Sequence, residues 1–359
     1  MAYSVLMSVY AKENAAYFSD AVESMLHQSC PPDQFVLVCD GPLTPGLDEA
    51  IQRFTASRDG GLFRVLRLPE NVGLGRALQA GLPLCDHDLV ARMDSDDLAL
   101  PLRMEHQLAL MAADPELAAV GGQIAEFTGA PDNIQGYRIV PTSPEEVRRG
   151  AAGRNPMNHM TVLFRREAVL AAGGYQDLKG FEDYFLWGRM LAAGFRLANL
   201  PEVCVLARVA GLQARRGGRE YFRQTVQLER ALRGCGLIGT GAYCKNLAVR
   251  FCGTVLLPDS LRQRVYQRHL RQREPKGLAW AGKPCAQAYL GCVVWSLYGG
   301  RELIPAEVFG SSVPVRFEGH TYCAPGGYDT YLRRLYGDYA PDPPPDKQVS
   351  HHHFRAWYR

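Results

Sequence analysis

Three features are missing from this sequence of 359 residues, and each absence narrows the class of protein. The opening stretch MAYSVLMSVY has no basic start and alternates like a β-strand, so we expect no secretory signal peptide. The longest apolar stretch, residues 285–297, is too short and too interrupted to span a bilayer. None of the ten cysteines forms a C-x-x-C pair, and most lie in apolar surroundings. We therefore expect reduced, buried thiols in a cytosolic protein, without disulfides or a zinc site.

Charge is unevenly spread along the chain, although its sum is only +3. Residues 208–276 hold 15 Lys and Arg against 4 Asp and Glu, a local charge of +11, which leaves −8 for the remainder. The composition, 47% hydrophobic and 21% charged, is that of an ordinary globular protein, long enough for one large domain and an appendage. We therefore expect a mildly acidic domain joined to a strongly basic segment.

Strand and helix patterns alternate along the first 120 residues. Strands are predicted in YSVLMSVY, QFVLVCD, FRVLRL and HDLVARMD, and helices at residues 13–30, 47–54, 76–82 and 101–113. Pro101 suits the first turn of the last helix. This alternation predicts an α/β protein with a doubly wound, mostly parallel sheet. Because ligands bind at the carboxyl ends of such strands, Asp40 and Asp94, each at a strand end, are expected to meet at one cleft.

Three carboxylates lie within four positions in the stretch MDSDD: Asp94, Asp96 and Asp97. Like charges packed this closely repel, so a positive partner is expected nearby. Hard oxygen ligands at a strand end suit Mg²⁺ or Mn²⁺, which take carboxylates together with substrate phosphates. The alternative interpretation is that Asp96 or Asp97 only helps to start the following helix. The cluster alone does not decide between the two.

Six motifs, taken in order, resemble those of the family 2 glycosyltransferases, nucleotide-sugar enzymes of the GT-A fold. MSVYAKE is similar to their first strand, VCDGP to their second, PENVGLGRAL to their Asn-x-Gly turn and ARMDSDD to their D-x-D motif. NHMTVLFRREAVLAAGGY followed by GFEDYFLW resembles their acceptor-side region with its Glu-Asp pair. The resemblance covers about residues 2–210 and is closest to members that build bacterial capsule, exopolysaccharide and O-antigen chains.

The resemblance implies a nucleotide site. Asp40 would accept a hydrogen bond from the nucleotide base, and Asn71, Gly73 and Arg76 would lie near the nucleotide. Two local alternatives stay open. Asp40 before Gly41 is also typical of a simple turn, and NVGLG is also typical of a turn that starts a helix.

The resemblance also implies a diphosphate and metal site. Arg92 would face the diphosphate, and a surface salt bridge is the alternative for this residue. Asp94 and Asp96 would be the D-x-D pair, with Asp96 the direct ligand of Mn²⁺ or Mg²⁺.

On the acceptor side, the resemblance assigns the general base to Asp183, with Glu182 orienting the site. An inverting transferase must deprotonate the acceptor hydroxyl as it attacks, and one carboxylate suffices. The alternative is that both acids only complement the dipole at a helix start. Trp187 would stack on a sugar or fill the core, and the core is favoured slightly. His159 would lie near the acceptor, although a single histidine is more often structural.

The C-terminal part resembles a different family. Residues 313–352, which include YGDY and a proline-rich run, are similar to the end of the LicD-type phosphotransferases, which attach phosphocholine or related groups to surface glycans. The resemblance covers about residues 285–353. That family's Asp-rich catalytic motif has no equivalent between residues 211 and 284, where the acids are isolated: Glu220, Glu229, Asp259 and Glu274. The tail is therefore predicted to be non-catalytic, and its HHH run is a poor preformed metal site.

The basic segment also contains apolar residues. The apolar area comes from Leu247, Val249, Phe251, Val255, Leu256 and Leu257, and the charge from Arg262, Arg264, Arg268, Arg271 and Arg273. Such segments bind anionic lipid, so we predict docking on the cytoplasmic leaflet that weakens as salt rises. A helical bundle packed on the catalytic domain is the alternative, and both can hold at once. A nucleic-acid surface is disfavoured, because no stacking aromatics are interleaved with the arginines.

Together, the motifs predict a GT-A domain over residues 1–210, a basic helical segment over 211–276 and a small LicD-like module over 277–359, with a linker at 275–283. The predicted activity is inverting, metal-dependent transfer of a hexosyl or N-acetylhexosaminyl group to a glycan or lipid-linked glycan, with a UDP-sugar favoured as donor. The predicted location is cytoplasmic, at the inner face of the plasma membrane. No nucleic-acid partner is expected. Two rivals are a LicD-type phosphotransferase, disfavoured by the missing acids, and a non-catalytic scaffold, disfavoured by the intact acidic motifs.

Overall fold

The chain separates into two units, residues 1–283 and residues 284–359. The predicted arginines 262–273 and the tail motifs YGDY and HHH lie outside the residues described. The computed structural model describes residues 1–56, 61–209, 218–256 and 277–282, and the backbone of four short strands in the second unit.

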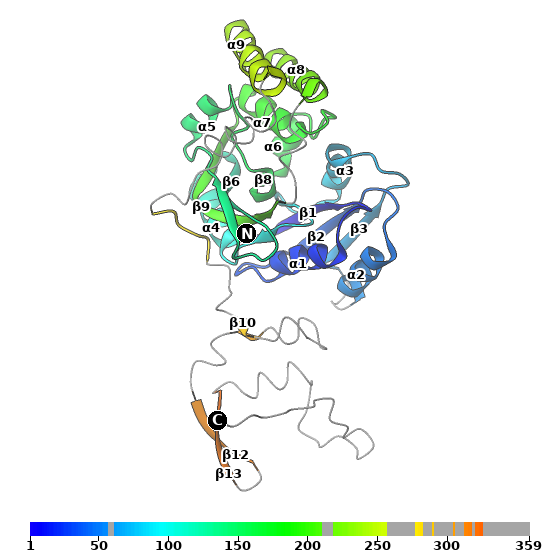
Figure 1. The fold of residues 1–359 in the computed structure, drawn as a ribbon, viewed down its shortest axis with the longest axis vertical. Helices are drawn as coiled ribbons and strands as arrows, with labels where there is room; N and C mark the ends of the chain where they lie inside the picture. Colours follow the sequence, from blue (N-terminus) through cyan, green and yellow to red (C-terminus); the bar gives the residue numbers. More distant parts are fainter. Residues whose placement is uncertain are drawn as a thin grey trace. The chain divides into compact units, whose positions relative to one another are not determined.

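The first half of the sheet is parallel (Figure 1). Its spatial order is β3-β2-β1-β4, so the chain steps from β1 to one edge and then crosses to the other side of β1. This is the doubly wound arrangement that the sequence pattern predicted. The bounds are β1 Tyr3–Val9, β2 Gln34–Cys39, β3 Phe63–Arg67 and β4 Leu89–Met93.

The second half of the sheet is mixed. β8 lies antiparallel between β4 and β6, β6 and β9 are parallel, and β5 and β7 are antiparallel neighbours of β9 and β6. Within the described residues the sheet has nine strands. The bounds are β5 Leu98–Ala99, β6 Leu117–Phe127, β7 Ile134–Arg138, β8 Leu163–Arg165 and β9 Arg196–Arg208.

Helices cover both faces of the sheet (Figure 1). Along β1, Met7 belongs to the core shared with α1, α2 and α4, whereas Leu6 belongs to the core shared with α3, α6 and α7. Both faces are buried, which explains why these strands are continuous apolar runs in the sequence. The bounds are α1 Ala15–Leu26, α2 Pro45–Ala56, α3 Leu74–Gly81, α4 Arg103–Ala113, α5 Pro144–Gly150, α6 Arg166–Ala171 and α7 Glu182–Ala192.

The last residue of α3 lies against the sheet. A Cβ atom on Gly81 would lie 2.5 Å from Val38 Cγ2 and 2.7 Å from Leu6 Cδ1. Only glycine permits so close an approach of helix and sheet.

The start of α4 differs from the sequence prediction. The helix begins at Arg103, its N-cap is Leu102, and no side chain caps it. Asp96 and Asp97 instead precede the short strand β5. The interpretation of these acids as helix starters is therefore wrong, because the chain forms a strand and a turn before the helix begins.

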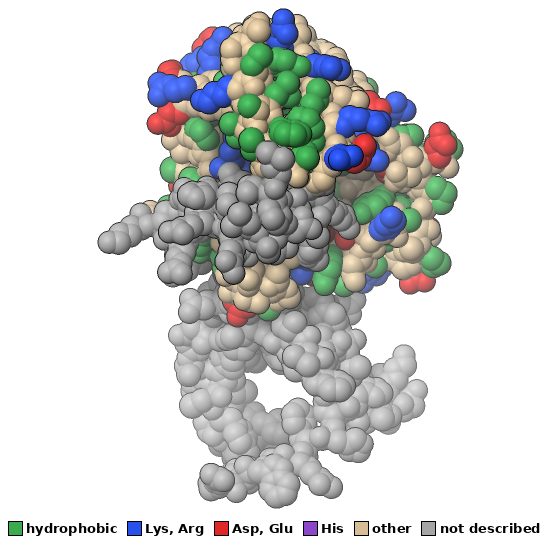
Figure 2. All heavy atoms as spheres, turned by 45° about the horizontal axis from the view of Figure 1, so that its top comes forward, with side chains coloured by type: hydrophobic (Ala, Val, Ile, Leu, Met, Phe, Trp, Pro, Cys, Tyr) green, Lys and Arg blue, Asp and Glu red, His purple; other side chains and the backbone are tan. Residues whose placement is uncertain are grey.

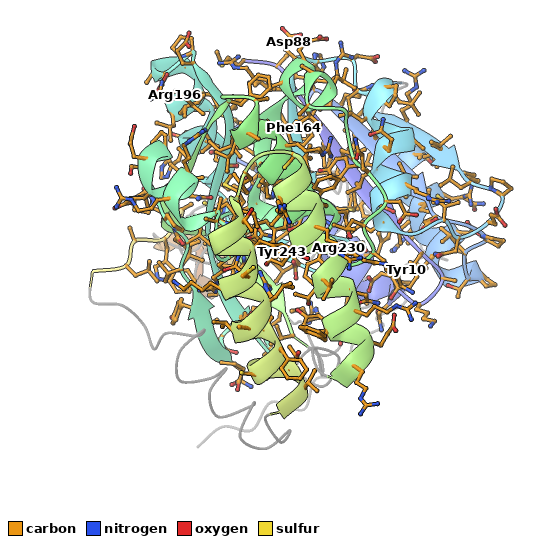
Figure 3. All side chains as sticks on the ribbon, turned by 90° about the horizontal axis from the view of Figure 1, so that it is seen from above. Tyr10, Asp88, Phe164, Arg196, Arg230 and Tyr243 are labelled. Atoms are coloured by element: carbon orange, nitrogen blue, oxygen red, sulfur yellow. The ribbon has the colours of Figure 1, made fainter. Side chains whose placement is uncertain are left out.

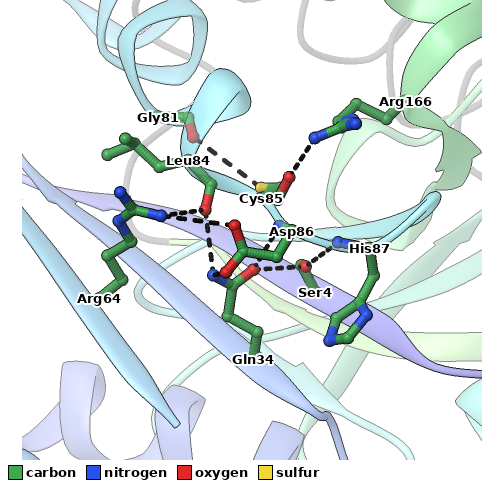
Figure 4. Close-up of polar contacts among 9 residues, drawn as sticks. All are labelled: Ser4, Gln34, Arg64, Gly81, Leu84, Cys85, Asp86, His87 and Arg166. Carbon is green, nitrogen blue, oxygen red and sulfur yellow. Dashed lines mark hydrogen bonds and ion pairs between the residues drawn. The ribbon is translucent and has the colours of Figure 1, made fainter. Parts of the chain in front are cut away.

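A hydrogen-bonded cluster ties together the amino ends of the parallel strands (Figure 4). Gln34 Nε2 donates to Asp86 Oδ2 at 2.7 Å, and Gln34 Oε1 accepts from Ser4 Oγ at 2.6 Å and from Asp86 N at 2.8 Å. Arg64 adds a partly exposed ion pair with Asp86 at 3.4 Å. Because the starts of neighbouring strands are tied together, the strands keep their register and their carboxyl ends meet at the opposite edge.

The described part of the basic segment forms a helical hairpin. Leu228 and Leu232 of its first helix pack with Tyr184 of α7, so the hairpin is attached to the catalytic domain. The two helices lie side by side in Figures 1 and 3. The bounds are α8 Gly218–Gly234 and α9 Thr240–Phe251, followed by the π-helical turn η4 Cys252–Leu256.

Residues 277–282, which were expected to form part of a linker, instead pack on the first unit. Ala281 is completely buried, its N–H donates to the Val203 carbonyl at 2.9 Å, and its carbonyl accepts from Leu102 N at 2.9 Å. Trp280 contacts the edge of the Tyr137 ring. This short stretch pairs with β9 at Val203. Its composition alone did not predict this pairing.

In the second unit the described strands form two antiparallel pairs. None of the described helices in either unit is both long and apolar enough to cross a membrane. The pairs join β10 Tyr289–Leu290 to β11 Ile304–Pro305 and β12 Ser312–Phe317 to β13 His320–Pro325.

Candidate active site

The predicted donor-side residues gather where the parallel strands end. Asp40 follows β2, Asp94 follows β4, and the loop that carries Glu13 follows β1. β1 lies between β2 and β4, so the three strand ends are neighbours at one edge of the sheet. Both acids therefore lie at the same edge, as the sequence pattern predicted.

Asp40 holds the loop that contains the Asn-x-Gly turn. Its Oδ1 accepts from Val72 N at 2.7 Å and its Oδ2 from Gly73 N at 3.1 Å, while Asn71 Nδ2 donates to the Asp40 carbonyl at 3.2 Å. Gly41 and Gly73 have φ values of 86° and 89°, which favour glycine, and a Cβ on Gly41 would lie 2.7 Å from Asn71 N. The turn interpretation and the proposed nucleotide role of Asp40 are thus compatible, since each carboxylate oxygen keeps a second lone pair.

The three acids after β4 form a compact group. One carboxylate oxygen from each of Asp94, Asp96 and Asp97 lies within 4.8 Å of the others. Burial, with the charges of Asp94 and Glu13, raises the pKa of Asp96 to about 7. Burial and the two neighbouring acids also raise the pKa of Asp97 well above its usual value. Arg92 offsets only part of the negative charge of this group, since the pKa values of Asp96 and Asp97 stay raised. The oxygen donors are those that Mn²⁺ or Mg²⁺ prefers, so the residues fit a divalent cation.

Arg92 is fully buried, so the surface salt bridge considered as its alternative is wrong. Its guanidinium pairs with the carboxylate of Asp94, and its Nε and one terminal nitrogen have no hydrogen-bond partner among the residues that the structure describes. Burial lowers the pKa of Arg92, but Asp94, together with Tyr175 and Asp97, raises it above its usual value, so Arg92 stays protonated. Buried donors without partners are costly. They are what a ligand with acceptor oxygens would satisfy.

Two further arginines, neither of them predicted from the sequence, hold the backbone of β4 and of the acidic loop that follows it. Arg103 is fully buried on α4 and donates to the Arg92 carbonyl at 2.8 Å. Arg208, at the end of β9, donates from its backbone N–H to Asp97 Oδ1 at 2.7 Å and from Nε to the Asp96 carbonyl at 3.1 Å. Its guanidinium lies 3.7 Å from the centre of the Tyr17 ring. The acids are therefore held in place by the framework around them.

The predicted acceptor-side pair, Glu182 and Asp183, opens α7. Asp183 Oδ2 accepts from Asn155 Nδ2 at 2.6 Å, and Asn155 Oδ1 in turn accepts from Met157 N at 3.2 Å, which sets the direction of the amide. Burial and the adjacent Asp183 raise the pKa of Glu182. Both acids lie in the first helical turn, so they also complement the helix dipole.

The start of α3 lies beside the start of α7. A Cβ on Gly75 would lie 3.0 Å from Glu182 Cβ, and Arg76 forms an ion pair with Asp177 at 2.7 Å. Both side chains of this ion pair are more than half exposed. The structure thus places Arg76 at the rim of the site, between the donor-side loop and the segment before α7.

Tyr175 is a buried residue of the segment between α6 and α7. Its hydroxyl is 2.9 Å from His159 Nε2. Burial raises the pKa of Tyr175, Arg92 opposes this, and the charges of Asp183, Glu182 and Asp94 add to the rise. The pKa of this buried phenol therefore responds both to Asp94 after β4 and to the acids at the start of α7.

His159 and Trp187 lie in the interior. Burial, and then Arg92, lowers the pKa of His159 well below its usual value, so the ring is neutral. Trp187 is completely buried, with its ring 6.0 Å from that of His159. No face of the Trp187 ring is open to a sugar, which supports the core interpretation.

The residues of this site that were not predicted from the sequence include Glu13, Arg103, Asn155, Tyr175 and Arg208. Glu13 accepts from Ser95 Oγ at 3.1 Å, and its position in the loop after β1 was a usable signal. Asn155 also lines a cavity of about 480 Å³ with residues that include Ile139, Glu146 and Arg154. Nothing in the local sequence marks Asn155 or Arg208, because each meets its acid through the fold.

Comparison with known proteins shows the family of this chain. Residues 4–171 match the family described as Glycosyl transferase family 2. An uncharacterized glycosyltransferase of Haemophilus influenzae is 41% identical over 273 residues, which cover 76% of this chain and 100% of that protein. The chain belongs to glycosyltransferase family 2. The amylovoran biosynthesis glycosyltransferase AmsE of Erwinia amylovora is 36% identical over 74% of this chain and 98% of its own length.

A third relative of this family 2 glycosyltransferase carries a more specific name. It is the UDP-Gal:alpha-D-GlcNAc-diphosphoundecaprenol beta-1,3-galactosyltransferase of Escherichia coli, 31% identical over 75% of this chain and 97% of its own length.

Solved structures confirm the GT-A-like fold. The mannosyltransferase PcManGT of Pyrobaculum calidifontis, solved with GDP-Man and Mn²⁺, superposes with a TM-score of 0.52 over 74% of this chain and 75% of its own, at 18% identity. Residues 1–349 of S. aureus TarS superpose with a TM-score of 0.51 over 76% of both chains, at 17% identity.

Proposed function

We propose that this family 2 glycosyltransferase is an inverting, metal-dependent enzyme of polysaccharide biosynthesis. It moves a hexosyl or N-acetylhexosaminyl group from a UDP-sugar to a lipid-linked or growing surface glycan. The observation that carries the proposal is that one domain holds two acidic groups: a metal-type cluster after β4, paired with Arg92, and a base-type pair at the start of α7. Leaving-group departure and proton removal are the two tasks of such a reaction, and each has its own carboxylates.

On the donor side, Asp40 accepts a hydrogen bond from the base, and Asn71 and Gly73 form the wall beside it. Asp96 and Asp94 would hold the metal, which would supply positive charge to the departing diphosphate. Arg92 offers its unpartnered donors to the diphosphate oxygens.

On the acceptor side, Asp183 takes the proton from the acceptor hydroxyl. The acceptor oxygen then forms its bond to the anomeric carbon while the bond from that carbon to the diphosphate oxygen breaks, and the electron pair leaves with the nucleoside diphosphate. Attack occurs on the face opposite the leaving group, so the anomeric configuration inverts. Glu182, with its raised pKa, orients the acceptor beside the base.

The relatives support the choice of substrates. The name of the E. coli relative specifies a UDP-sugar and a diphosphoundecaprenol-linked acceptor, and that of the Erwinia relative specifies amylovoran biosynthesis. TarS has been solved with UDP-GlcNAc, and PcManGT with Mn²⁺. A lipid-linked acceptor places the enzyme at the inner face of the plasma membrane, where such acceptors are held.

The test is a donor screen. Purified full-length protein is incubated with Mn²⁺, a panel of UDP-, GDP- and dTDP-sugars, and GlcNAc linked through diphosphate to a lipid chain. We expect a UDP-sugar to be consumed and the product to carry the inverted anomeric configuration by NMR. A product of retained configuration, or turnover that persists in EDTA, would contradict the proposal. The Asp183→Asn variant serves as the matched inactive control.

A further inference from the structure

The outer helix of the hairpin rests on the inner one and has no buried side chain of its own. None of the residues of α9 is buried. α8 has the buried contacts: Leu228 and Leu232 pack on the domain, and Glu229 is completely buried. Glu229 holds α9 through Arg250 Nε at 2.8 Å and Asn246 Nδ2 at 3.0 Å. The hairpin is thus firmly attached on its inner side, and its outer side is open.

Apolar side chains gather on that open side. Val249 is 63% exposed and Phe251 40% exposed, and both are among the few large apolar residues exposed on the described surface. Figure 2 shows a band of apolar side chains over the hairpin, broader than the isolated apolar residues elsewhere on this face. The exposed apolar side chains of this band on α9 and the start of η4 are Cys244, Ala248, Val249, Phe251 and Cys252.

Positive charge surrounds the apolar band. Figure 2 shows Lys and Arg side chains on both of its sides. Five cations on the two helices are exposed, against a single exposed acid, Glu220, because Glu229 is buried in its ion pair. These cations are Arg219, Arg223, Arg230, Arg233 and Lys245. Arg230 on α8 and Tyr243 on α9 are labelled in Figure 3.

We infer that this surface of α8 and α9, the hairpin surface, docks on an anionic lipid bilayer. A protein binds to a membrane surface through apolar side chains that enter the headgroup region and through cations that contact lipid phosphates. The hairpin surface carries both. A nucleic-acid ligand would use the cations but would leave the aliphatic and sulfur side chains of the band in water. The inference extends the sequence prediction, which rested on residues 247–273, to the four arginines of α8.

The hairpin adjoins the acceptor side of the site. Asn246 Nδ2 donates to the Ala152 carbonyl at 2.8 Å, three residues before the Asn155 that holds Asp183. The Tyr221 ring lies 5.8 Å from that of Phe181, the residue before Glu182. Resting on the proposed function, the inference gives the docking a purpose: it brings the base close to the membrane that holds a lipid-linked acceptor.

Vesicle sedimentation of the full chain tests the inference. We expect binding to vesicles of phosphatidylglycerol and phosphatidylethanolamine, and at least roughly tenfold weaker binding to vesicles of phosphatidylcholine. Raising NaCl from about 50 to 500 mM should release the protein. Effects of this size are what about five cations and their screening by salt allow.

Two exposed substitutions locate the surface. Arg230→Glu and Val249→Asp are each expected to weaken binding by roughly tenfold. Their matched controls are Arg53→Glu on α2, an exposed cation, and Leu170→Asp on α6, an apolar residue 39% exposed, which should leave binding unchanged. Equal loss in test and control variants would overturn the inference, as would negligible binding to both kinds of vesicle.

Two further outcomes would assign the surface to another partner. If the chain dimerises without vesicles and Val249→Asp abolishes the dimer, the band is an interface between copies. If a DNA duplex binds more tightly than anionic vesicles, the cations serve nucleic acid. Transfer to a short, water-soluble acceptor is measured in parallel. Intact transfer with no vesicle binding refutes the docking alone, and vesicle binding without any transfer refutes the proposed function alone.

Discussion

Replacing Asp96 with asparagine is expected to stabilise the metal-free protein while abolishing its response to metal. The pKa of Asp96 rises from an ordinary 3.8 to about 7, chiefly through burial and then through Asp94 and Glu13. A raised carboxyl pKa contributes no penalty below pH 4, and the folded state then loses stability as pH rises through the folded pKa. The pKa of Asp96 differs by about 3 units between the folded and unfolded states. This difference can lower the free energy of unfolding by at most roughly 4 kcal/mol.

Between pH 5 and pH 8, the wild type in EDTA should lose about 2–3 kcal/mol of this amount. The melting temperature should therefore fall by roughly 5 °C over this interval. Asp96→Asn removes the titrating group, so its melting temperature in EDTA should exceed that of the wild type at pH 8 and match it more closely at pH 5. Saturating Mn²⁺ should restore the wild type at pH 8 and leave the variant unchanged.

Differential scanning fluorimetry at pH 5 and pH 8, with EDTA or Mn²⁺, checks these values. Asp132→Asn, an exposed acid in the turn between β6 and β7, is the matched control and should behave as the wild type. The reasoning is refuted if Asp96→Asn lowers the melting temperature at pH 8 in EDTA. It is also refuted if Mn²⁺ stabilises the variant as much as the wild type.

Three other predictions concern the base, its neighbour and the end of the first unit. Asp183→Asn should lower kcat by ~10²-fold or more and leave donor affinity by calorimetry intact; normal turnover would mean that another group is the base. Asn155→Ala should lower kcat about tenfold with an unchanged donor KM, and Asn155→Asp should lower it further, because a second carboxylate would face Asp183 at hydrogen-bond distance; steady-state kinetics showing unchanged kcat in both would remove Asn155 from the site. A chain ending at residue 283 should keep transferase activity and stability. A chain ending at Lys276 should lose roughly 3 kcal/mol, because three backbone hydrogen bonds made by Ala279 and Ala281 disappear; equal urea midpoints for the two chains would show that residues 277–282 contribute nothing.

The elements of the catalytic domain were largely predictable because their signals are local. The apolar runs of β1, β2 and β4 and the periodic helices between them implied a doubly wound sheet, and strand-end acids then implied a shared edge. Boundaries were less accurate. α4 begins at Arg103 rather than at Pro101, since the two-residue strand β5 pairs with β9, more than 100 residues later.

What the sequence by itself determined is the series of strands and helices on the donor side and the family, because periodicity and acidic motifs are read within short windows of the chain. Only the tertiary structure decided that Arg92 is buried and paired with Asp94. It also decided that Asn155 contacts Asp183 and that Arg208 contacts Asp97. It also decided that residues 277–282 return to β9. Each of these depends on contacts between segments that local periodicity does not connect, and burial changes both the charge and the hydrogen-bond needs of a residue only once its neighbours are in place.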